Sequence, residues 1–263
     1  MTPILILGAG RMGGALIEGW RRAGAFALDQ LIIRDPYLPP EAAAVLAGAR
    51  VNPPDAELAD ARTVLLAVKP QVWRQAAAAL APLLHPEAVI VSIAAGVRVA
   101  DIADAFGGRR VARVIPTTAV AICKGVTSIV AADKTSRARA HALFEPVGVT
   151  VDIPAEGLMD VTTAVSGSAP AYLYAFIEAL EAAGEAEGLT AEASRTLVRS
   201  TLIGAAALLD HTGEDPAELR RQVTSPAGTT EAALKVLMGE HGLWPLAAEA
   251  VAAAVKRSKE LGG

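Results

Sequence analysis

Short, continuously apolar runs recur along the first half of the chain and alternate with Ala-rich stretches of helical periodicity. The runs are PILILG, LIIRD, TVLLAV, AVIVSI and RVARVI, at residues 3–8, 31–35, 63–68, 88–93 and 110–115, and the clearest helical stretches are 12–24 and 71–84. Strands that are apolar throughout are typical of a parallel sheet covered on both faces. Right-handed strand–helix–strand units then predict a doubly wound α/β sheet. GVTSIVAAD and GVTVDIP flank a helical stretch at 134–145 and are expected to add edge strands.

The pattern changes after residue 154. Apolar positions there follow helical spacing without a convincing strand, which predicts helices at 169–187, 190–212, 215–222, 229–239 and 243–261. Their side chains are mostly small, so the bundle has few large apolar groups to bury. This favours a homodimer over a self-sufficient bundle. Two domains are therefore expected, an α/β domain at 1–154 and an all-helical dimerisation domain at 155–263.

Composition excludes several classes of protein and leaves this architecture unchanged. The 263 residues carry a formal net charge of −4, so neither nucleic acid nor an anionic membrane is an expected partner. Cys123 is the only cysteine and the four histidines are not at ligand spacing, so no disulfide within the chain and no metal site is expected. We find no targeting segment and no apolar stretch long enough to span a membrane. A soluble, cytoplasmic protein is the expectation.

A glycine-rich turn follows the first predicted strand and opens the first predicted helix. Its sequence, Gly8-Ala9-Gly10-Arg11-Met12-Gly13, has the spacing G-x-G-x-x-G. In this context Gly8 makes a tight turn, Gly10 lets the backbone approach a pyrophosphate, and Gly13 lets helix and strand pack closely. The helix start adds unpaired N–H groups and a partial positive charge. We therefore predict a dinucleotide site formed by these residues, including Arg11 and Met12.

The second strand ends in Arg34-Asp35-Pro36, where the residue that reads the cofactor ribose is expected. An acid at this point accepts a hydrogen bond from the 2′-hydroxyl of NAD, whereas an arginine favours the 2′-phosphate of NADP. The two signals conflict. We favour NADP(H), with NAD(H) as the alternative, because the guanidinium of Arg34 can pair with a phosphate and also neutralise Asp35.

Two more strand ends lie on the edge where ligands bind in open α/β sheets. Ala67-Val68-Lys69-Pro70 ends the third clear strand, and Lys69 is either a cofactor contact or a surface lysine at a strand-to-helix turn. Ala94-Ala95-Gly96 ends the next strand, and its small residues leave room for a nicotinamide ring. All seven residues are candidates for cofactor binding.

The second half of the chain offers little for acid–base catalysis. No lysine occurs between Lys134 and Lys235, and His211 stands beside Asp210 at a predicted helix end, where it caps rather than catalyses. Reduction of a ketone would need a group to handle the hydroxyl proton. A substrate that already carries its proton, such as an iminium ion, needs orientation more than a general acid, and such a substrate fits these residues.

The stretch VTSPAGTTEAAL, residues 223–234, starts a predicted helix with more hydroxyls than a cap requires. Ser225, Thr229 and Thr230 stand here beside Gly228, which would let another molecule approach the backbone. Amides at a helix start bind small anions such as a carboxylate. The residues alone leave a plain helix entrance equally open, with Ser225 as cap and Pro226 in the first turn.

Together these motifs resemble the pyrroline-5-carboxylate reductase family. The resemblance rests on ILGAGRMGGAL, LAVKPQ, SIAAGV, AVSGSAPAY and VTSPAGTTEAAL, and it runs from the first strand to about residue 240. It implies an N-terminal Rossmann domain, a helical domain that interlocks two subunits, and assembly in some members as rings of dimers. The implied reaction is NAD(P)H-dependent reduction of 1-pyrroline-5-carboxylate to L-proline.

The resemblance also implies roles for single residues. The loop from Ser225 to Thr230, with Gly228 and Thr229, would hold the substrate carboxylate through backbone amides. Thr230 would bond the ring nitrogen and is the expected catalytic residue. Asn52, in RVNPP, matches an asparagine that touches the cofactor ribose.

The chain departs from the family pattern in one loop and at two glycines. Pro116-Thr117-Thr118-Ala119 stands where members commonly carry Pro-Asn-Thr-Pro. Thr117 is still a candidate substrate contact, but a hydroxyl cannot replace both the donor and the acceptor of an amide. Ala169 and Ala227 each replace a frequent glycine.

Three other functions remain open at this point. A β-hydroxyacid-type dehydrogenase shares the two-domain layout but relies on a lysine of the helical domain, and the lysine gap across 135–234 counts against it. A reductase of a related six-membered cyclic imine would need the same site. A dinucleotide-binding sensor without turnover is suggested by the altered 116–119 loop.

Overall fold

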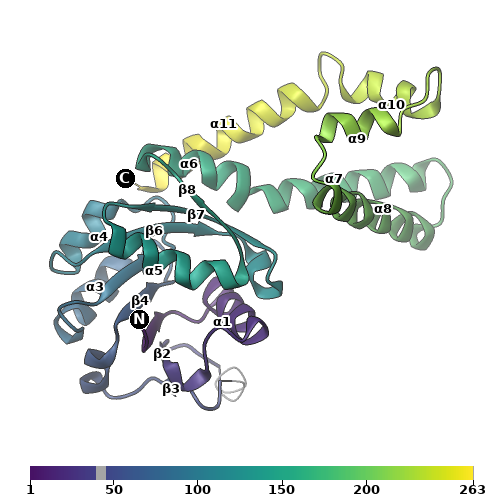
Figure 1. Ribbon diagram of the computed structural model, residues 1–263. Helices are drawn as coiled ribbons and strands as arrows, with labels where there is room; N and C mark the ends of the chain where they lie inside the picture. The colour runs from purple at the N-terminus through teal and green to yellow at the C-terminus, as the bar shows by residue number, and fades with distance from the viewer. Residues whose placement is uncertain (40–45, 263) are drawn as a thin grey trace. The chain divides into compact units, whose positions relative to one another are not determined.

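The computed structural model describes residues 1–39 and 46–262, which form two compact units (Figure 1). The first unit consists of Met1–Gly167 together with Ala254–Gly263, and the second of Ser168–Ala253. The domain boundary expected at residue 154 stays a prediction.

An eight-stranded sheet forms the centre of the first unit. Its strand order is β3-β2-β1-β4-β5-β6-β7-β8. All neighbouring strands are parallel except β6 and β7, which are antiparallel. The strands are β1 (Ile4–Leu7), β2 (Leu31–Arg34), β3 (Arg50–Val51), β4 (Thr63–Leu66), β5 (Val89–Ser92), β6 (Val111–Pro116), β7 (Gly125–Ala131) and β8 (Gly148–Asp152).

The predicted Rossmann-type sheet is confirmed in each of its five apolar runs. Two details differ from the expectation. The two-residue strand β3 lies outside β2, too short for a hydrophobic pattern to reveal. β7 is not an edge strand, since it pairs with β6 on one side and β8 on the other, and only β8 lies at the edge.

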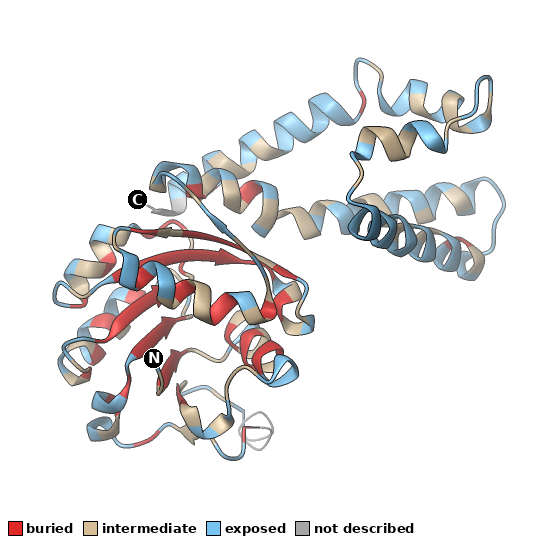
Figure 2. Ribbon diagram, viewed as in Figure 1, coloured by how far each residue is buried: buried red, intermediate tan, exposed pale blue. Residues whose placement is uncertain are grey.

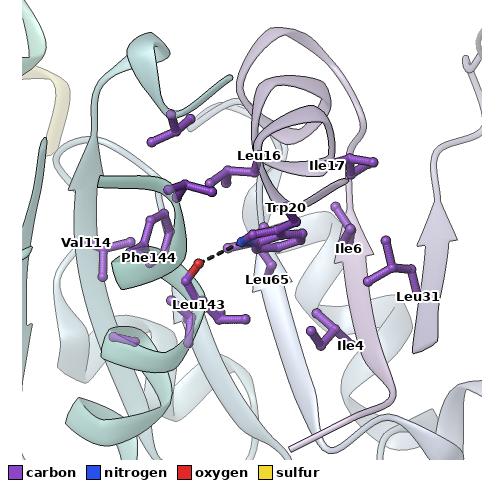
Figure 3. Packing of buried hydrophobic residues seen from close by; sticks show 14 of the residues in the cluster. Ile4, Ile6, Leu16, Ile17, Trp20, Leu31, Leu65, Val114, Leu143 and Phe144 are labelled. Carbon is purple, nitrogen blue, oxygen red and sulfur yellow. Dashed lines mark hydrogen bonds between the residues drawn. The ribbon is translucent and has the colours of Figure 1, made fainter. Parts of the chain in front are cut away.

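Helices cover both faces of the sheet, as the continuously apolar strands require. The residues of α1 (Arg11–Ala23) and α5 (Lys134–Phe144) pack into one buried cluster, and those of α3 (Trp73–Leu80) and α4 (Val99–Ala105) into the other. In the first cluster the fully buried Trp20 donates its indole N–H to the carbonyl of Leu143, 2.6 Å away (Figure 3). This bond joins α1 to α5 across the face that they share.

Short helical turns complete the first unit. The 3₁₀ segments are η1 (Leu28–Gln30), η2 (Asp55–Asp60), η3 (Ala81–Leu83), η4 (Thr118–Ile122), η5 (Glu145–Val147) and η6 (Glu156–Leu158). They are followed by α6 (Met159–Thr162) and the π-helical η7 (Thr163–Gly167).

The end of the chain returns to the first unit through a polar cluster. Ser258 donates its hydroxyl to Asp160 at 2.6 Å, and Asp160 lies 3.9 Å from the buried guanidinium of Arg113 on β6. Another nitrogen of Arg113 bonds Glu156 at 3.3 Å, whose carboxylate also accepts the N–H of Val99 at 2.7 Å. The C-terminal segment is therefore tied to the middle of the sheet and to the first turn of α4.

The second unit is built from helices alone, as predicted. They are α7 (Ala169–Ala186), α8 (Ala191–Thr212), α9 (Pro216–Gln222), α10 (Thr229–Leu237) and α11 (Leu243–Gly262), whose last residues belong to the first unit. Among the helices of the described residues, none combines the length and apolar character needed to cross a membrane.

Most of the second unit is coloured as exposed or intermediate in Figure 2, and several of its large apolar side chains are among the exposed residues. Ile203 is 72% exposed, Val236 75% and Trp244 58%. Within Ser168–Ala253, all of which the structure describes, only Ser194 and Gly242 are buried. This unit by itself therefore has no buried apolar core, which a stable helical bundle in water requires.

Candidate functional site

The glycine-rich turn has the geometry that a dinucleotide site needs. Gly8 adopts a positive φ of 92°, and a Cβ on Gly13 would lie 2.2 Å from the carbonyl oxygen of Gly8, so both must be glycine for α1 to pack this close to the turn. A Cβ on Gly10 would meet nothing within 4 Å. The open side of the turn is thus at Gly10, the position expected to face a pyrophosphate.

The start of α1 carries amides that are free to bind an anion. Gly10 is the N-cap, and no side chain caps the helix. The first helical bond runs from the N–H of Gly14 to the carbonyl of Gly10 at 2.7 Å. Within the described chain the N–H groups of Arg11, Met12 and Gly13 therefore have no acceptor, and the helix start adds a partial positive charge.

Asp35 holds the glycine turn against the end of β2. One carboxylate oxygen accepts the N–H of Ala9 at 2.9 Å, and the other accepts the N–H of Tyr37 at 2.9 Å. The side chain of Asn52 brackets the backbone of Asp35, accepting its N–H at 3.0 Å and donating to its carbonyl at 2.9 Å. Asp35 and Asn52 thus lie together beside the turn, where a ribose is expected.

Arg34 does not neutralise Asp35, and that part of the prediction is wrong. Its guanidinium donates to the carbonyl of Pro53 at 2.9 Å and to the carboxylate of Asp55 on η2 at 2.7 Å. The carboxylate of Asp35 accepts backbone N–H groups instead, from Ala9 and Tyr37. Asp55 was missed because it lies 21 residues from Arg34.

The two other strand ends lie on the same carboxyl edge of the sheet. Ala67 lies next to the glycine-rich turn, because a Cβ on Gly8 would be 2.9 Å from the carbonyl oxygen of Ala67. Val68 is partly buried and Lys69 exposed, and a turn at Pro70 precedes α3, which begins at Trp73.

The segment after β5 carries the small residues in which the sequence predicts room for a nicotinamide ring. Ala94 and Gly96 are buried, Ala95 is partly buried, and Gly96 has a positive φ of 76°. These three residues lead into α4, whose first amide is held by Glu156. Whether they face a nicotinamide ring stays a prediction.

Thr117 is buried at the end of β6, and its hydroxyl has a structural partner. The Oγ1 atom accepts the N–H of Val126 at 3.1 Å, while the N–H of Thr117 bonds the carbonyl of Val126 at 3.0 Å. The side chain therefore closes the β6–β7 connection. The hydroxyl of Thr117 can still donate one hydrogen bond to a ligand.

At and just before the AVSGSAPAY stretch, three hydroxyls bond the backbone, whereas the buried hydroxyl of Tyr172 has no partner in the described chain. Those of Thr162 and Thr163 donate to the carbonyl of Met159 at 2.9 Å, and that of Ser166 donates to the carbonyl of Thr162 at 2.7 Å. They belong to α6 and the π-helical turn η7. Such turns are frequent at functional sites, but these hydroxyls serve the backbone.

In the second unit, the segment before α10 is a tight turn. The N–H of Gly228 bonds the carbonyl of Ser225 at 3.1 Å, with Pro226 and Ala227 between them. Ala227 has a φ of 55°. Proline followed by a residue of positive φ is the pattern of a type II turn, which favours glycine at the Ala227 position.

Ser225 does not cap α10. Gly228 is the N-cap and the helix begins at Thr229. A Cβ on Gly228 would lie 2.5 Å from the hydroxyl and 3.0 Å from the carbonyl oxygen of Ser225, so the turn itself disfavours a side chain here. Access for a ligand is therefore not the only explanation for a glycine at this position.

Glu231 occupies part of the helix entrance and was not predicted. Its carboxylate accepts the N–H of Ala227 at 2.6 Å and lies 3.1 Å from the ammonium of Lys235. The hydrogen bond from Ala227, followed by that from Lys235, lowers the pKa of Glu231. A glutamate three residues after the N-cap is the sequence signal for such a bond.

Three amides at the helix start, those of Thr229, Thr230 and Glu231, remain available. The first bond within α10 runs from Ala232 to the carbonyl of Gly228. The three N–H groups before it have no acceptor in the described chain. Thr229 is exposed and Thr230 half-buried. This entrance can therefore accept a small anion, as the sequence suggested.

The glycine turn, the uncapped start of α1 and the carboxylate at the end of β2 define a dinucleotide-binding protein of the Rossmann type. A cofactor fits here, because Gly10 is open and the adjacent amides are free. Gly8, Gly10, Arg11, Met12, Gly13, Arg34, Asp35 and Asn52 would hold it.

Comparison with known proteins identifies the class more closely. A family model described as pyrroline-5-carboxylate reductase dimerisation matches residues 156–261, and one described as NADP oxidoreductase, coenzyme F420-dependent, matches residues 3–96. The chain is 41% identical to pyrroline-5-carboxylate reductase of Pseudomonas aeruginosa, over 99% of this chain and 97% of that protein. It belongs to the pyrroline-5-carboxylate reductase family.

Solved structures agree with this assignment. A pyrroline-5-carboxylate reductase from Coxiella burnetii is 30% identical, with a TM-score of 0.90 over 100% of this chain and 99% of that one. The Plasmodium falciparum pyrroline carboxylate reductase, solved with NADP bound, is 26% identical, with a TM-score of 0.86 over 100% and 98%.

Proposed function

We propose that this protein reduces 1-pyrroline-5-carboxylate to L-proline with a nicotinamide dinucleotide. Membership of the reductase family over the whole chain carries the proposal. The free amides at the α1 start and the open face of Gly10 support a bound dinucleotide. When bound, a reduced nicotinamide supplies the hydride that adds to the carbon of the C=N bond, whose electron pair moves to nitrogen.

The α10 entrance is proposed to bind the substrate carboxylate. The N–H groups of Thr229 and Thr230 are free, and the helix start favours a negative charge. The turn Ser225–Gly228 fixes their direction. The hydroxyl of Thr230 is proposed to bond the ring nitrogen, and the chain's contribution to the rate is mainly positioning. Thr117 keeps a smaller role, as the donor of one O–H.

NADP(H) is the preferred cofactor in this proposal, with NAD(H) as an alternative. Arg34 at the end of β2 provides the positive charge that a 2′-phosphate requires. Asp35 keeps two lone-pair positions for a ribose hydroxyl beside the bonds from Ala9 and Tyr37. A cytoplasmic location, based on the single cysteine Cys123, stays a prediction.

A homodimer is the proposed assembly. The match of residues 156–261 to a dimerisation family and the exposed apolar residues of the second unit support it. A second copy of the chain would supply the apolar surface that the helices lack. A ring of dimers stays a prediction.

Loss of reduced-nicotinamide absorbance on addition of 1-pyrroline-5-carboxylate tests the reaction directly. Thr230→Ala is expected to lower kcat/KM by roughly 10- to 1,000-fold, because one hydrogen bond to a charged centre is lost. Thr230→Ser should recover most of it, and Thr229→Ala, which keeps the amide, should change it little. An unchanged kcat/KM in Thr230→Ala removes Thr230 from the mechanism. Cofactor binding without oxidation by any imine would favour a sensor.

A further inference from the structure

The end of β2 carries an ion pair that bears on cofactor choice. The guanidinium of Arg34 lies 2.7 Å from the carboxylate of Asp55, the first residue of η2, and its other terminal nitrogen bonds the carbonyl of Pro53. Both side chains are partly exposed, Arg34 at 34% and Asp55 at 56%. The cation that would bind a 2′-phosphate thus already has an anionic partner.

We propose that Asp55 is a specificity-determining residue that limits the preference for NADP(H) over NAD(H). The inference rests on the dinucleotide site of the proposed function. Asp55 acts through Arg34, since it holds the guanidinium toward η2 and offsets its charge. A 2′-phosphate must compete with this carboxylate, whereas a 2′-hydroxyl has no need of Arg34.

The neighbouring charges strengthen the effect. Asp35 lies directly after Arg34, and its carboxylate is held beside the glycine turn by the N–H groups of Ala9 and Tyr37. A 2′-phosphate would therefore approach one guanidinium and two carboxylates. Removing the charge of Asp55 leaves one guanidinium and one carboxylate. This change favours binding of the doubly charged 2′-phosphate more than binding of the neutral 2′-hydroxyl.

A purely structural role makes a different prediction. If the pair only tethers η2 to β2, its loss would weaken the binding of both cofactors alike. A matched pair serves as control on the same segment, because Arg50 bonds Asp60, the last residue of η2, also at 2.7 Å. Its exposed fractions, 29% and 59%, are similar.

Isothermal titration of the full chain with NADP⁺ and with NAD⁺ tests the proposal without turnover. Asp55→Asn, which keeps the shape and removes the charge, is expected to raise the ratio of NADP⁺ to NAD⁺ affinity by roughly 5- to 10-fold at low salt. The gain should shrink at high salt. Asp60→Asn should leave the ratio within about 2-fold of wild type.

A second background establishes the route through Arg34. In Arg34→Gln, the substitution Asp55→Asn should no longer change the ratio by more than about 2-fold. A full effect in that background would show direct repulsion by Asp55 and overturn the proposal, as would an unchanged ratio in Asp55→Asn alone. If the wild type binds both cofactors but reduces no imine, the proposed reaction fails and this inference stands.

Discussion

At the residue scale, Ala227 shows the cost of departing from the family glycine. Its φ of 55° lies in the left-handed region, where a Cβ approaches the following carbonyl. Ala169, the other alanine in place of a frequent glycine, is the first residue of α7 and has helical geometry. The same replacement therefore has opposite consequences at the two positions.

We expect Ala227→Gly to raise the free energy of unfolding by about 1 kcal/mol, because glycine relieves the left-handed strain. Ala169→Gly should lower it by about 0.5–1 kcal/mol, since glycine is a poor helix former. Urea unfolding of the full chain at one protein concentration measures both. Equal signs for the two variants would contradict this account of the turn.

Residues near one another in the sequence were predicted more successfully than distant partners. The spacing Gly8, Gly10, Gly13 places three roles in six positions, and the structure gives each glycine the expected surroundings. The pairing of Arg34 with Asp55 could not be predicted, because it depends on where a connecting segment folds back. Glu231 could have been found from its spacing after Gly228.

At the element scale, periodicity predicted the long helices well and the short elements poorly. The predicted run 190–212 corresponds to Ala191–Thr212, and the run 229–239 to Thr229–Leu237. β3 has two residues and η7 five, so neither is long enough for a repeating pattern to be recognised. Their formation depends on tertiary contacts, which periodicity does not record.

The start of α5 depends on one carboxylate. Asp133 is the N-cap and accepts the N–H groups of Thr135 at 2.8 Å and Ser136 at 3.0 Å. Burial alone would raise the pKa of Asp133, but the hydrogen bonds from Ser136 and Thr135 lower it below its ordinary value. The ionised form is therefore the one that stabilises the fold.

Asp133→Ala is expected to lower the free energy of unfolding by about 1 kcal/mol at neutral pH. At neutral pH, Asp133→Asn should lower the free energy of unfolding by less, because an amide oxygen still caps the helix. Because the folded pKa is depressed, the charge contribution is complete above the unfolded pKa of about 3.9 and is lost as pH falls through the folded value. Urea unfolding of wild type and Asp133→Asn should show that the difference between their free energies of unfolding narrows from neutral to acid pH. A difference that does not change with pH would mean that the charge of Asp133 does not contribute to the cap.

At the scale of the whole molecule, the two units differ in how they bury apolar surface. The sheet of the first unit lies between two buried clusters, one against each face. The second unit exposes Ile203, Val236 and Trp244 and buries no large side chain. Its stability is therefore expected to depend on a second copy of the chain, and hence on protein concentration.

The urea midpoint of the wild type should rise with protein concentration. Ile203→Glu, which places a charge on the exposed apolar face of α8, is expected to weaken dimerisation at least about 100-fold, as measured by sedimentation. Val149→Glu is the control, because Val149 is 65% exposed on the edge strand β8 of the first unit. A wild-type midpoint that is independent of concentration would refute the dependence on a partner copy.

The bond between Ser258 and Asp160 has a consequence for how the protein is made. Synthesis proceeds from the N-terminus, and domains generally fold in that order. Here the first unit receives its last segment, Ala254–Gly263, after the whole second unit has been translated. On the ribosome this contact cannot form until Ser258 has been translated, so a chain that stops before Ser258 would leave Asp160 without that hydrogen bond beside Arg113.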